Sequence, residues 1–213
     1  IITRANGEGF PVRIHCTGDG GVRMALNAFE ASVKANGRHG LRNGIEHVEL
    51  VEDEDYPRFA ELDVMANKQP AHYYLCTEKF MLDALGQRRW FRSQPLKSLY
   101  DAGAKVSLST DFPIVEINPF HNMYVAVTRL DLEGNEIGAD INEKIDIFQA
   151  LEGYTYMGAY AMGLEDRLGS LEAGKLADIA VIDGRIFDEP SEKLLERKAL
   201  LTMMDGRVVY KAE

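Results

Sequence analysis

Residues 12–16 read VRIHC and residues 105–111 read KVSLSTD. In both runs apolar and polar side chains alternate, and a period of two residues is typical of a β-strand. Two further runs have β character, GIEHVEL from Gly44 and DVMANKQP from Asp63 to Pro70. Apolar residues at helical spacing separate these runs. Strands that alternate with helices pair in parallel through right-handed crossovers, so the sequence predicts an α/β fold.

Four such units are half of the eight that close a TIM-type βα barrel. The tail has a different pattern, because ADIAVID at residues 177–183 and ALLTMMDGRVVYK at residues 199–211 predict strands, the second folding back at Asp205-Gly206. We therefore expect residues 1–168 to form half of a TIM-type barrel. We expect residues 169–213 to form part of a small β-sandwich lobe.

Composition excludes several classes of partner. A chain of 213 residues with a formal net charge of -10 and no basic stripe is not expected to bind nucleic acid. No apolar run approaches the roughly 20 residues that span a bilayer, so we expect no membrane contact. Cys16 and Cys76 are too few for a disulfide scaffold, which favours free thiols and a cytoplasmic location.

The ends of the predicted half barrel raise a second expectation about partners. The first residue is Ile1, and the opening residues look like the end of a helix, so we expect further sequence before them. A half barrel leaves two sheet edges unpaired, and exposed edges associate. We therefore expect the chain to form a homo-oligomer or to pair with a missing N-terminal half of the barrel.

The region after the fourth predicted strand is long. A loop of about thirty residues follows Asp111, and loops of that length at a strand's carboxyl end usually shape a site. We expect Asn142 to cap the helix that follows it.

Three side chains that bind metals lie near the carboxyl ends of predicted strands. His15, His47 and Asp111 hold these positions, and that end of a βα barrel carries the chemistry. Imidazole and carboxylate groups suit zinc and similar divalent ions. The alternative is that both histidines are buried and hydrogen-bonded to the main chain, while Asp111 caps the following turn.

Six short motifs, in order along the chain, resemble those of the amidohydrolase superfamily, in particular the branch called amidohydrolase family 3. The motifs are HCTGD at 15–19, IEH at 45–47, QPAH at 69–72, STDFP at 109–113, VTR at 127–129, and GSLEAGK at 169–175 with ADI at 177–179. The first four resemble the family's motifs on strands five to eight. The resemblance therefore implies the C-terminal half of the barrel.

The resemblance also assigns roles to the residues of these motifs. It implies that His15 and His47 bind a divalent metal, zinc, and that Asp111 binds metal and acts as the general base. In the intact enzyme one or two ions are expected, and no other cofactor. His72 is a candidate for contacting substrate, although a structural role is open. Arg89 and Arg129 are candidates for binding an acidic substrate group, with ion pairing to the protein's own carboxylates as the alternative.

The function that follows is a metal-dependent hydrolase that acts on carbon–nitrogen bonds, other than peptide bonds, through a metal-activated water. The sequence contains no HxH motif, which the superfamily places on strand one. We therefore expect this chain alone to bind zinc weakly and to hydrolyse nothing. The alternative is a non-catalytic binding or regulatory protein that keeps the scaffold; a metal-assisted isomerisation or decarboxylation is a third option.

Overall fold

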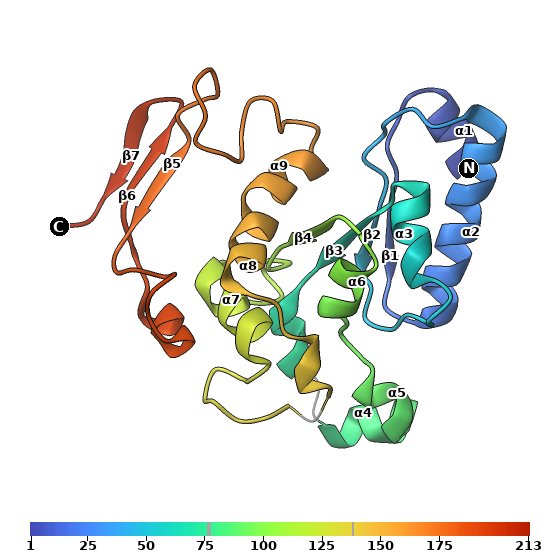
Figure 1. Ribbon diagram of the computed structural model, residues 1–213, viewed down its shortest axis with the longest axis horizontal. Coiled ribbons are helices and arrows are strands. Elements are labelled where there is room, and N and C mark those ends of the chain that lie inside the picture. The colour runs from blue at the N-terminus through green and yellow to red at the C-terminus, as the bar shows by residue number, and fades with distance from the viewer. Residues whose placement is uncertain (76–77, 138) are drawn as a thin grey trace.

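The structure is a computed structural model that describes residues 1–75, 78–137 and 139–213 (Figure 1). Its centre is a four-stranded parallel sheet in the order β1-β2-β3-β4. The strands are β1 (Arg13–Cys16), β2 (Gly44–His47), β3 (Met65–Lys68) and β4 (Val106–Leu108). The parallel sheet confirms the predicted α/β fold class and the predicted parallel pairing of the four strands.

Helices connect the strands as the alternating pattern predicts. The crossovers contain α2 (Asp19–Asn36), α3 (Tyr56–Leu62) and α6 (Lys97–Asp101), and α1 (Ile2–Gly7) precedes the sheet. The third crossover is the longest and also holds η1 (Pro70–Tyr74), α4 (Glu78–Leu85) and α5 (Gln87–Phe91). Figure 1 shows α4 and α5 beyond the end of the sheet where the parallel strands finish. The predicted free thiol at Cys76 lies outside the described residues.

The register of the sheet separates an apolar face from a polar face. Ile45, Ala66 and Val106 pair side by side and are buried in the same core as Leu26 and Phe29 of α2. The next row of the sheet is polar and contains His15, Glu46, Asn67 and Ser107. Because side chains alternate between the faces of a sheet, this polar row lies on the face away from the helices.

Two expectations for the region after β4 were wrong. The supposed thirty-residue loop contains α7 (Pro119–Thr128), with Asn118 accepting a hydrogen bond from Phe120 N. Asn142 does not cap the next helix, since it lies in η2 (Ile141–Glu143). Asp146 is the cap, in a capping box with Gln149. The helices that follow are α8 (Ile147–Tyr154) and α9 (Tyr156–Ala161).

The tail forms a separate antiparallel sheet, as predicted. Its strands are β5 (Ile179–Ile182), β6 (Ala199–Met204) and β7 (Arg207–Lys211), in that order. Asp205 and Gly206 both have positive φ, at 49° and 75°, which is the conformation of a two-residue hairpin turn. Between β5 and β6, η3 (Ser191–Glu196) packs on α7 and buries Leu194 in the main core.

Among the described residues, no helix has both the length and the apolar character needed to cross a membrane.

Candidate metal centre

His15 and His47 lie together at the carboxyl end of the parallel sheet. His15 is the third residue of β1, and His47 is the last residue of β2. Their ring centroids are 4.3 Å apart, with the rings inclined at 68°. His15 is exposed at the edge of the sheet, whereas His47 is only 8% exposed. The parallel pairing of β1 with β2 thus brings two predicted metal ligands into contact.

His72 and Asp111 complete the cluster from the next two strands. Pro70 starts η1 directly after β3, and this turn brings the His72 ring to 5.4 Å from the His47 ring, nearly parallel to it. His72 Nε2 lies 3.6 Å from Asp111 Oδ2. One ligand atom each from His47, His72 and Asp111 lies within 4.8 Å of the other two. The structure therefore groups His72 with two of the predicted ligands, and His15 borders this group without belonging to it.

The nitrogen atoms of this cluster are suited to bind a cation. His47 Nδ1 and His72 Nε2 are buried, and neither has a hydrogen-bond partner among the described residues. Burial, and then the neighbouring His47, lowers the pKa of His72, so its ring is neutral near pH 7. A neutral imidazole with a free nitrogen is a metal ligand, and an orphaned buried nitrogen is otherwise costly. The residues present fit a divalent metal ion better than they fit the alternative of fully hydrogen-bonded core histidines.

Asp111 keeps its carboxylate available to the cluster. The turn after β4 is stabilised by Thr110, whose Oγ1 accepts from Phe112 N at 3.2 Å. Asp111 itself has a left-handed φ of 57°, and its side chain is 42% exposed. Among the described residues no hydrogen bond ties its carboxylate to that turn, which argues against a capping role.

Arg89 and Asp19 form an ion pair close to the cluster. Asp19 lies in the first turn of α2, shortly after His15, and Arg89 of α5 donates to its Oδ1. Burial alone would raise the pKa of Asp19, but the hydrogen bond from Gly20 N and the charge of Arg89 outweigh it and lower that pKa. Arg89 therefore has an ion-pair partner, and a contact with substrate stays a prediction.

Arg129 is a buried cation at the end of α7. Its side chain is 2% exposed and stacks over the Tyr73 ring at 4.0 Å. It donates to the main-chain oxygen atoms of Gln94, at 2.9 Å, and Ser93, at 3.3 Å. These contacts hold the main chain, and a direct contact between Arg129 and substrate stays a prediction.

Lys68 is a residue of this region that no sequence motif identified. It is 1% exposed, at the end of β3, and donates to His47 O at 2.6 Å, Val48 O at 2.9 Å and Gln94 Oε1 at 3.1 Å. Burial lowers its pKa to about 7, and no carboxylate among the described residues forms an ion pair with it. A lone lysine in a strand usually faces water. The available signal in the sequence was that Lys68 directly precedes the QPAH motif at 69–72.

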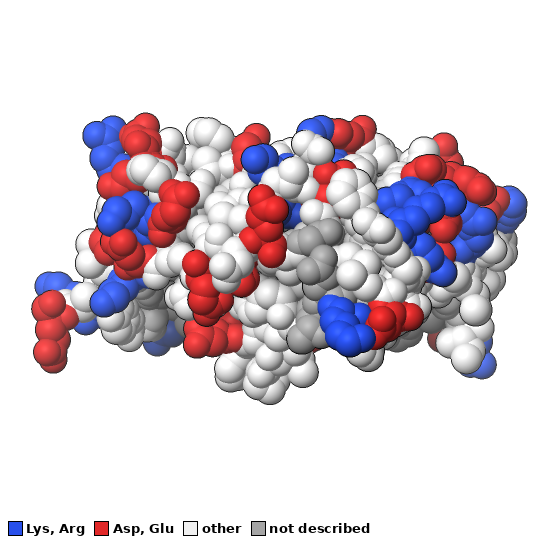
Figure 2. Space-filling view, turned by 90° about the horizontal axis from the view of Figure 1, so that it is seen from below, with Lys and Arg blue, Asp and Glu red and all other residues white. Residues whose placement is uncertain are grey.

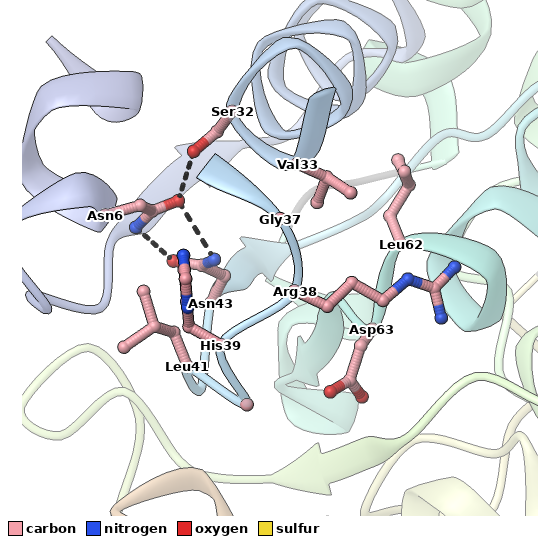
Figure 3. A pocket seen from close by; sticks show the side chains of 11 residues that line it. Asn6, Ser32, Val33, Gly37, Arg38, His39, Leu41, Asn43, Leu62 and Asp63 are labelled. Carbon is pink, nitrogen blue, oxygen red and sulfur yellow. Dashed lines mark hydrogen bonds between the residues drawn. The ribbon is translucent and has the colours of Figure 1, made fainter. Parts of the chain in front are cut away.

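Two cavities lie at opposite ends of the sheet. A cavity of about 450 Å³ lies near the carboxyl ends of β1 and β2, and Asp19, Leu50, Arg88, Arg89 and Arg92 are among its lining residues. A cavity of about 30 Å³ lies at the amino end, beside Asn6, Ser32 and His39 (Figure 3). The smaller one has room for about one water molecule. On the face seen in Figure 2, basic and acidic side chains are interspersed and form no basic stripe.

A comparison with protein families decides the relationship of this chain. A family model described as the amidohydrolase family matches residues 1–210.

The chain belongs to the amidohydrolase family.

Relatives within and around the family are considerably longer than this chain. It is 32% identical over 207 residues to the protein LONG AFTER FAR-RED 3 of Arabidopsis thaliana, and 30% identical over 211 residues to the N-substituted formamide deformylase of Arthrobacter pascens. These matches cover 97% and 99% of this chain but only 35% and 38% of the relatives. The structure also resembles an uncharacterized metal-dependent hydrolase from Pyrococcus furiosus, with a TM-score of 0.67 and 32% identity. That match covers 82% of this chain and 33% of the hydrolase.

Within the amidohydrolase family, the cluster at the carboxyl end of the sheet corresponds to the four motifs that suggested the resemblance. Each of His15, His47, His72 and Asp111 belongs to one of these motifs. The fold thus brings together residues that lie as far as 96 positions apart in the sequence, from His15 to Asp111.

Proposed function

We propose that this chain carries part of the active site of a metal-dependent hydrolase that acts on carbon–nitrogen bonds other than peptide bonds. The observation that carries the proposal is the convergence of His47, His72 and Asp111 within 4.8 Å, with free nitrogen atoms on both buried rings. Membership of the amidohydrolase family supports it. So does the similarity to a metal-dependent hydrolase.

The proposed ligands are His15, His47 and Asp111, with His72 as a further donor. These side chains would hold a divalent ion, and zinc suits this set of imidazole and carboxylate donors; a bound ion would supply the positive charge that lowers the pKa of a water molecule to about 7. Asp111 accepts a proton from the attacking water at Oδ2 and returns it to the leaving nitrogen atom. His72 is proposed to contact the substrate as well, and the 3.6 Å between its Nε2 and that oxygen supports this proposal.

The substrate is proposed to be a small molecule with an acidic substituent. Arg88, Arg89 and Arg92 line the cavity of about 450 Å³, over the apolar side chains of Leu50 and Val51. Arg89 and Arg92 each form an ion pair with a carboxylate through one terminal nitrogen, whereas Arg88 has no ion pair among the described residues. Guanidinium groups bind carboxylates through paired hydrogen bonds, so Arg88 and Arg89 are the groups proposed to bind that substituent. A direct contact between Arg129 and substrate stays a proposal, and the contacts of its side chain among the described residues are with main-chain oxygen atoms and Tyr73.

The architecture around this site is proposed to be a TIM-type barrel, with β1 to β4 as its strands five to eight. The proposed division places the barrel in residues 1–168 and the β lobe in residues 169–213. β1 and β4 each pair on one side only within the described sheet. We propose that further strands, from a second copy or from a longer chain, pair with these edges. A cytoplasmic location is proposed as well, because Cys16 is a free thiol.

The test of the metal site is a zinc titration of the purified chain by isothermal calorimetry. We expect weak uptake and no measurable hydrolysis, because the sequence contains no HxH motif, which supplies further metal ligands in the superfamily. His47→Gln and Asp111→Asn are expected to abolish the uptake, whereas His39→Gln, a matched control at the amino end of the sheet, leaves it unchanged. Tight stoichiometric uptake would contradict the prediction that this chain alone has an incomplete metal site. Absence of any uptake, or uptake that survives both changes, would overturn the proposed metal centre.

Comparing two further variants separates the roles of His15 and His72. If His15 is a ligand and His72 contacts only substrate, His15→Gln weakens zinc binding and His72→Gln does not. The reverse result would assign the third ligand to His72. Zinc uptake without turnover of any carbon–nitrogen substrate, by a protein with the length of the relatives, would favour the non-catalytic binding protein.

A further inference from the structure

The left-handed backbone at the end of β2 requires an explanation. His47 and Val48 have φ values of 73° and 51°, in a backbone region that residues other than glycine rarely adopt. Val48 is also β-branched, which makes this conformation less favourable still. Each such residue is energetically unfavourable and persists only where its surroundings hold it. The strain falls directly on a proposed metal ligand, so something must fix this turn.

The contacts of Lys68 provide that restraint. Its ammonium group donates to the carbonyl oxygen atoms of both strained residues, His47 and Val48, and to the side chain of Gln94. A lysine has three N–H donors, and these three acceptors satisfy all of them. Lys68 extends to the face of β3 that the helices cover, whereas its neighbour Asn67 lies in the polar row.

Gln94 connects this restraint to a second buried cation. Gln94 also has a left-handed φ, of 55°, and its N–H donates to Glu49 O at 2.7 Å. Its carbonyl oxygen accepts from Arg129, which is itself left-handed at 61°. We call Lys68, His47, Val48, Gln94 and Arg129 the Lys68 cluster. Both of its cations are buried, and neither forms an ion pair among the described residues.

We propose that Lys68 is a positioning residue that fixes the orientation of the His47 imidazole through the main chain of His47 and Val48. The inference rests on the proposed metal site and deepens it, because it assigns a role to a residue that touches neither ion nor substrate. Burying an ammonium group without a carboxylate partner has a large desolvation cost, so packing alone does not explain a lysine at this position. All three of its N–H groups donate to acceptors at the site, namely His47 O, Val48 O and Gln94 Oε1. Removing the ammonium group is therefore expected to change the structure only around this turn.

The main test is hydrogen exchange of the metal-free chain, compared between the wild type and Lys68→Met. Methionine keeps the length and apolar character of the side chain and removes the donors. The amides of Val48, Leu50 and Gln94 donate to Cys16 O, Thr17 O and Glu49 O, and they report on this turn. We expect their exchange to become about tenfold faster, with the amides in the middle of α2 unchanged.

The matched control is Lys105→Met. Lys105 is part-buried rather than fully buried, and it hydrogen-bonds to Asp63 and Tyr160 at the amino end of the same sheet. We expect this change to leave the exchange of Val48, Leu50 and Gln94 as in the wild type. Equal acceleration in both variants, or acceleration throughout the chain in Lys68→Met, would show a general packing role and overturn the inference.

Zinc affinity gives the second readout. Loss of a residue that orients a ligand typically weakens metal binding 10- to 100-fold, so we expect at least about tenfold weaker zinc binding in Lys68→Met and no change in Lys105→Met. Unchanged affinity together with unchanged exchange would refute the positioning role. If the wild type binds no zinc, the proposed metal centre fails, and the exchange data alone decide the role of Lys68.

A milder variant covers the case in which Lys68→Met does not fold. Gln94→Gly removes the side-chain acceptor of Lys68 at a left-handed position that glycine adopts readily. We expect faster exchange at Val48 and Leu50 in the same direction as for Lys68→Met, by a smaller factor. A Gln94→Gly chain with wild-type exchange at these amides would contradict the inference.

Discussion

The two ends of the parallel sheet differ in how completely their polar groups are paired. At the amino end, Asn6 and Asn43 exchange side-chain hydrogen bonds of 3.0 and 3.2 Å, and Ser32 donates to Asn6 (Figure 3). Close by, Lys105 forms an ion pair with Asp63. These contacts connect α1, α2 and the starts of the strands, so they are expected to stabilise the fold at the amino end of the sheet.

At the carboxyl end, buried polar atoms lack partners and the backbone is strained. His47 Nδ1, His72 Nε2 and Ser93 Oγ are unpaired among the described residues. Seven described residues other than glycine have positive φ, and five surround the site: His47, Val48, Gln94, Asp111 and Arg129. Because unpaired groups and strain lower stability, a bound ligand has more to stabilise at this end than at the other.

The largest effect that tests this comparison is expected from Asn6→Ala at the amino end. Asn6 is 4% exposed and hydrogen-bonds to Phe10, Ser32 and Asn43. Its loss leaves buried partners unsatisfied, so the free energy of unfolding should fall by about 3 kcal/mol in urea denaturation. The control Asn27→Ala, at an exposed position of α2, should change it by about 0.5 kcal/mol at most. A loss no larger than that of the control would refute the stabilising role of the amino end.

The second effect concerns the packing behind the carboxyl end. A Cβ atom on Gly153 of α8 would lie 2.7 Å from Leu108 Cγ, at the end of β4. Gly153→Ala should therefore lower the free energy of unfolding by about 1–3 kcal/mol. Gly158→Ala in α9, where a Cβ meets only ordinary contact at 3.9 Å, should raise it by about 0.4–1 kcal/mol. Similar values for the two alanine variants would show that Leu108 moves freely.

The third test uses pH at the amino end. Burial would raise the pKa of Glu165, but hydrogen bonds from its own main chain and from Arg42 outweigh it, so the pKa is lowered from its ordinary 4.5. The stabilisation is complete above pH 4.5 and is lost as the pH falls through the lowered folded-state value. Urea unfolding between pH 6 and about pH 3 should show a smaller acid loss in Glu165→Gln than in the wild type. An identical pH dependence in both proteins would contradict this contribution. The pairing here is incomplete, since Glu165 Oε2 is buried and has no hydrogen-bond partner among the described residues.

The smallest expected effect is also the most direct comparison of the two ends. Ser93 Oγ is buried at the carboxyl end and has no partner in the described part of the chain, whereas Ser32 Oγ is buried and donates to Asn6 at 2.9 Å. Ser93→Ala should raise the free energy of unfolding by up to about 1 kcal/mol, and Ser32→Ala should lower it by about 1 kcal/mol. Thermal or urea unfolding of both variants measures the difference. Changes of the same sign would remove the contrast between the ends.

The sequence predicted where strands begin better than where they end. The pattern of GIEHVEL suggested a strand through Leu50, but β2 ends at His47, where the chain becomes left-handed. β4 likewise ends at Leu108, short of Asp111. Alternation of side chains reports extended backbone, whereas a left-handed turn depends on distant contacts such as those of Lys68. No local pattern contains that information.

The two errors after β4 have different causes. Residues 119–128 are apolar on most sides, so α7 has no one-sided stripe to reveal it, and Asn118 followed by Pro119 was the available signal. Gln149, three residues after Asp146, is the sequence signal for the capping box at Asp146, and Asn142 lacks such a partner three residues later. The candidate site was easier to predict, since four short motifs placed His15, His47, His72 and Asp111 at one end of the sheet.

The position of Leu194 has a consequence for how the chain unfolds. This side chain comes from the segment between two strands of the tail, yet it is 3% exposed and belongs to the same apolar core as Met123 and Tyr124 of α7. The tail therefore cannot detach without opening that core to water. The two sheets are distinct in topology, but through Leu194 they share one apolar core and are expected to unfold together. Deleting the tail would expose that core to water and destabilise the rest of the chain.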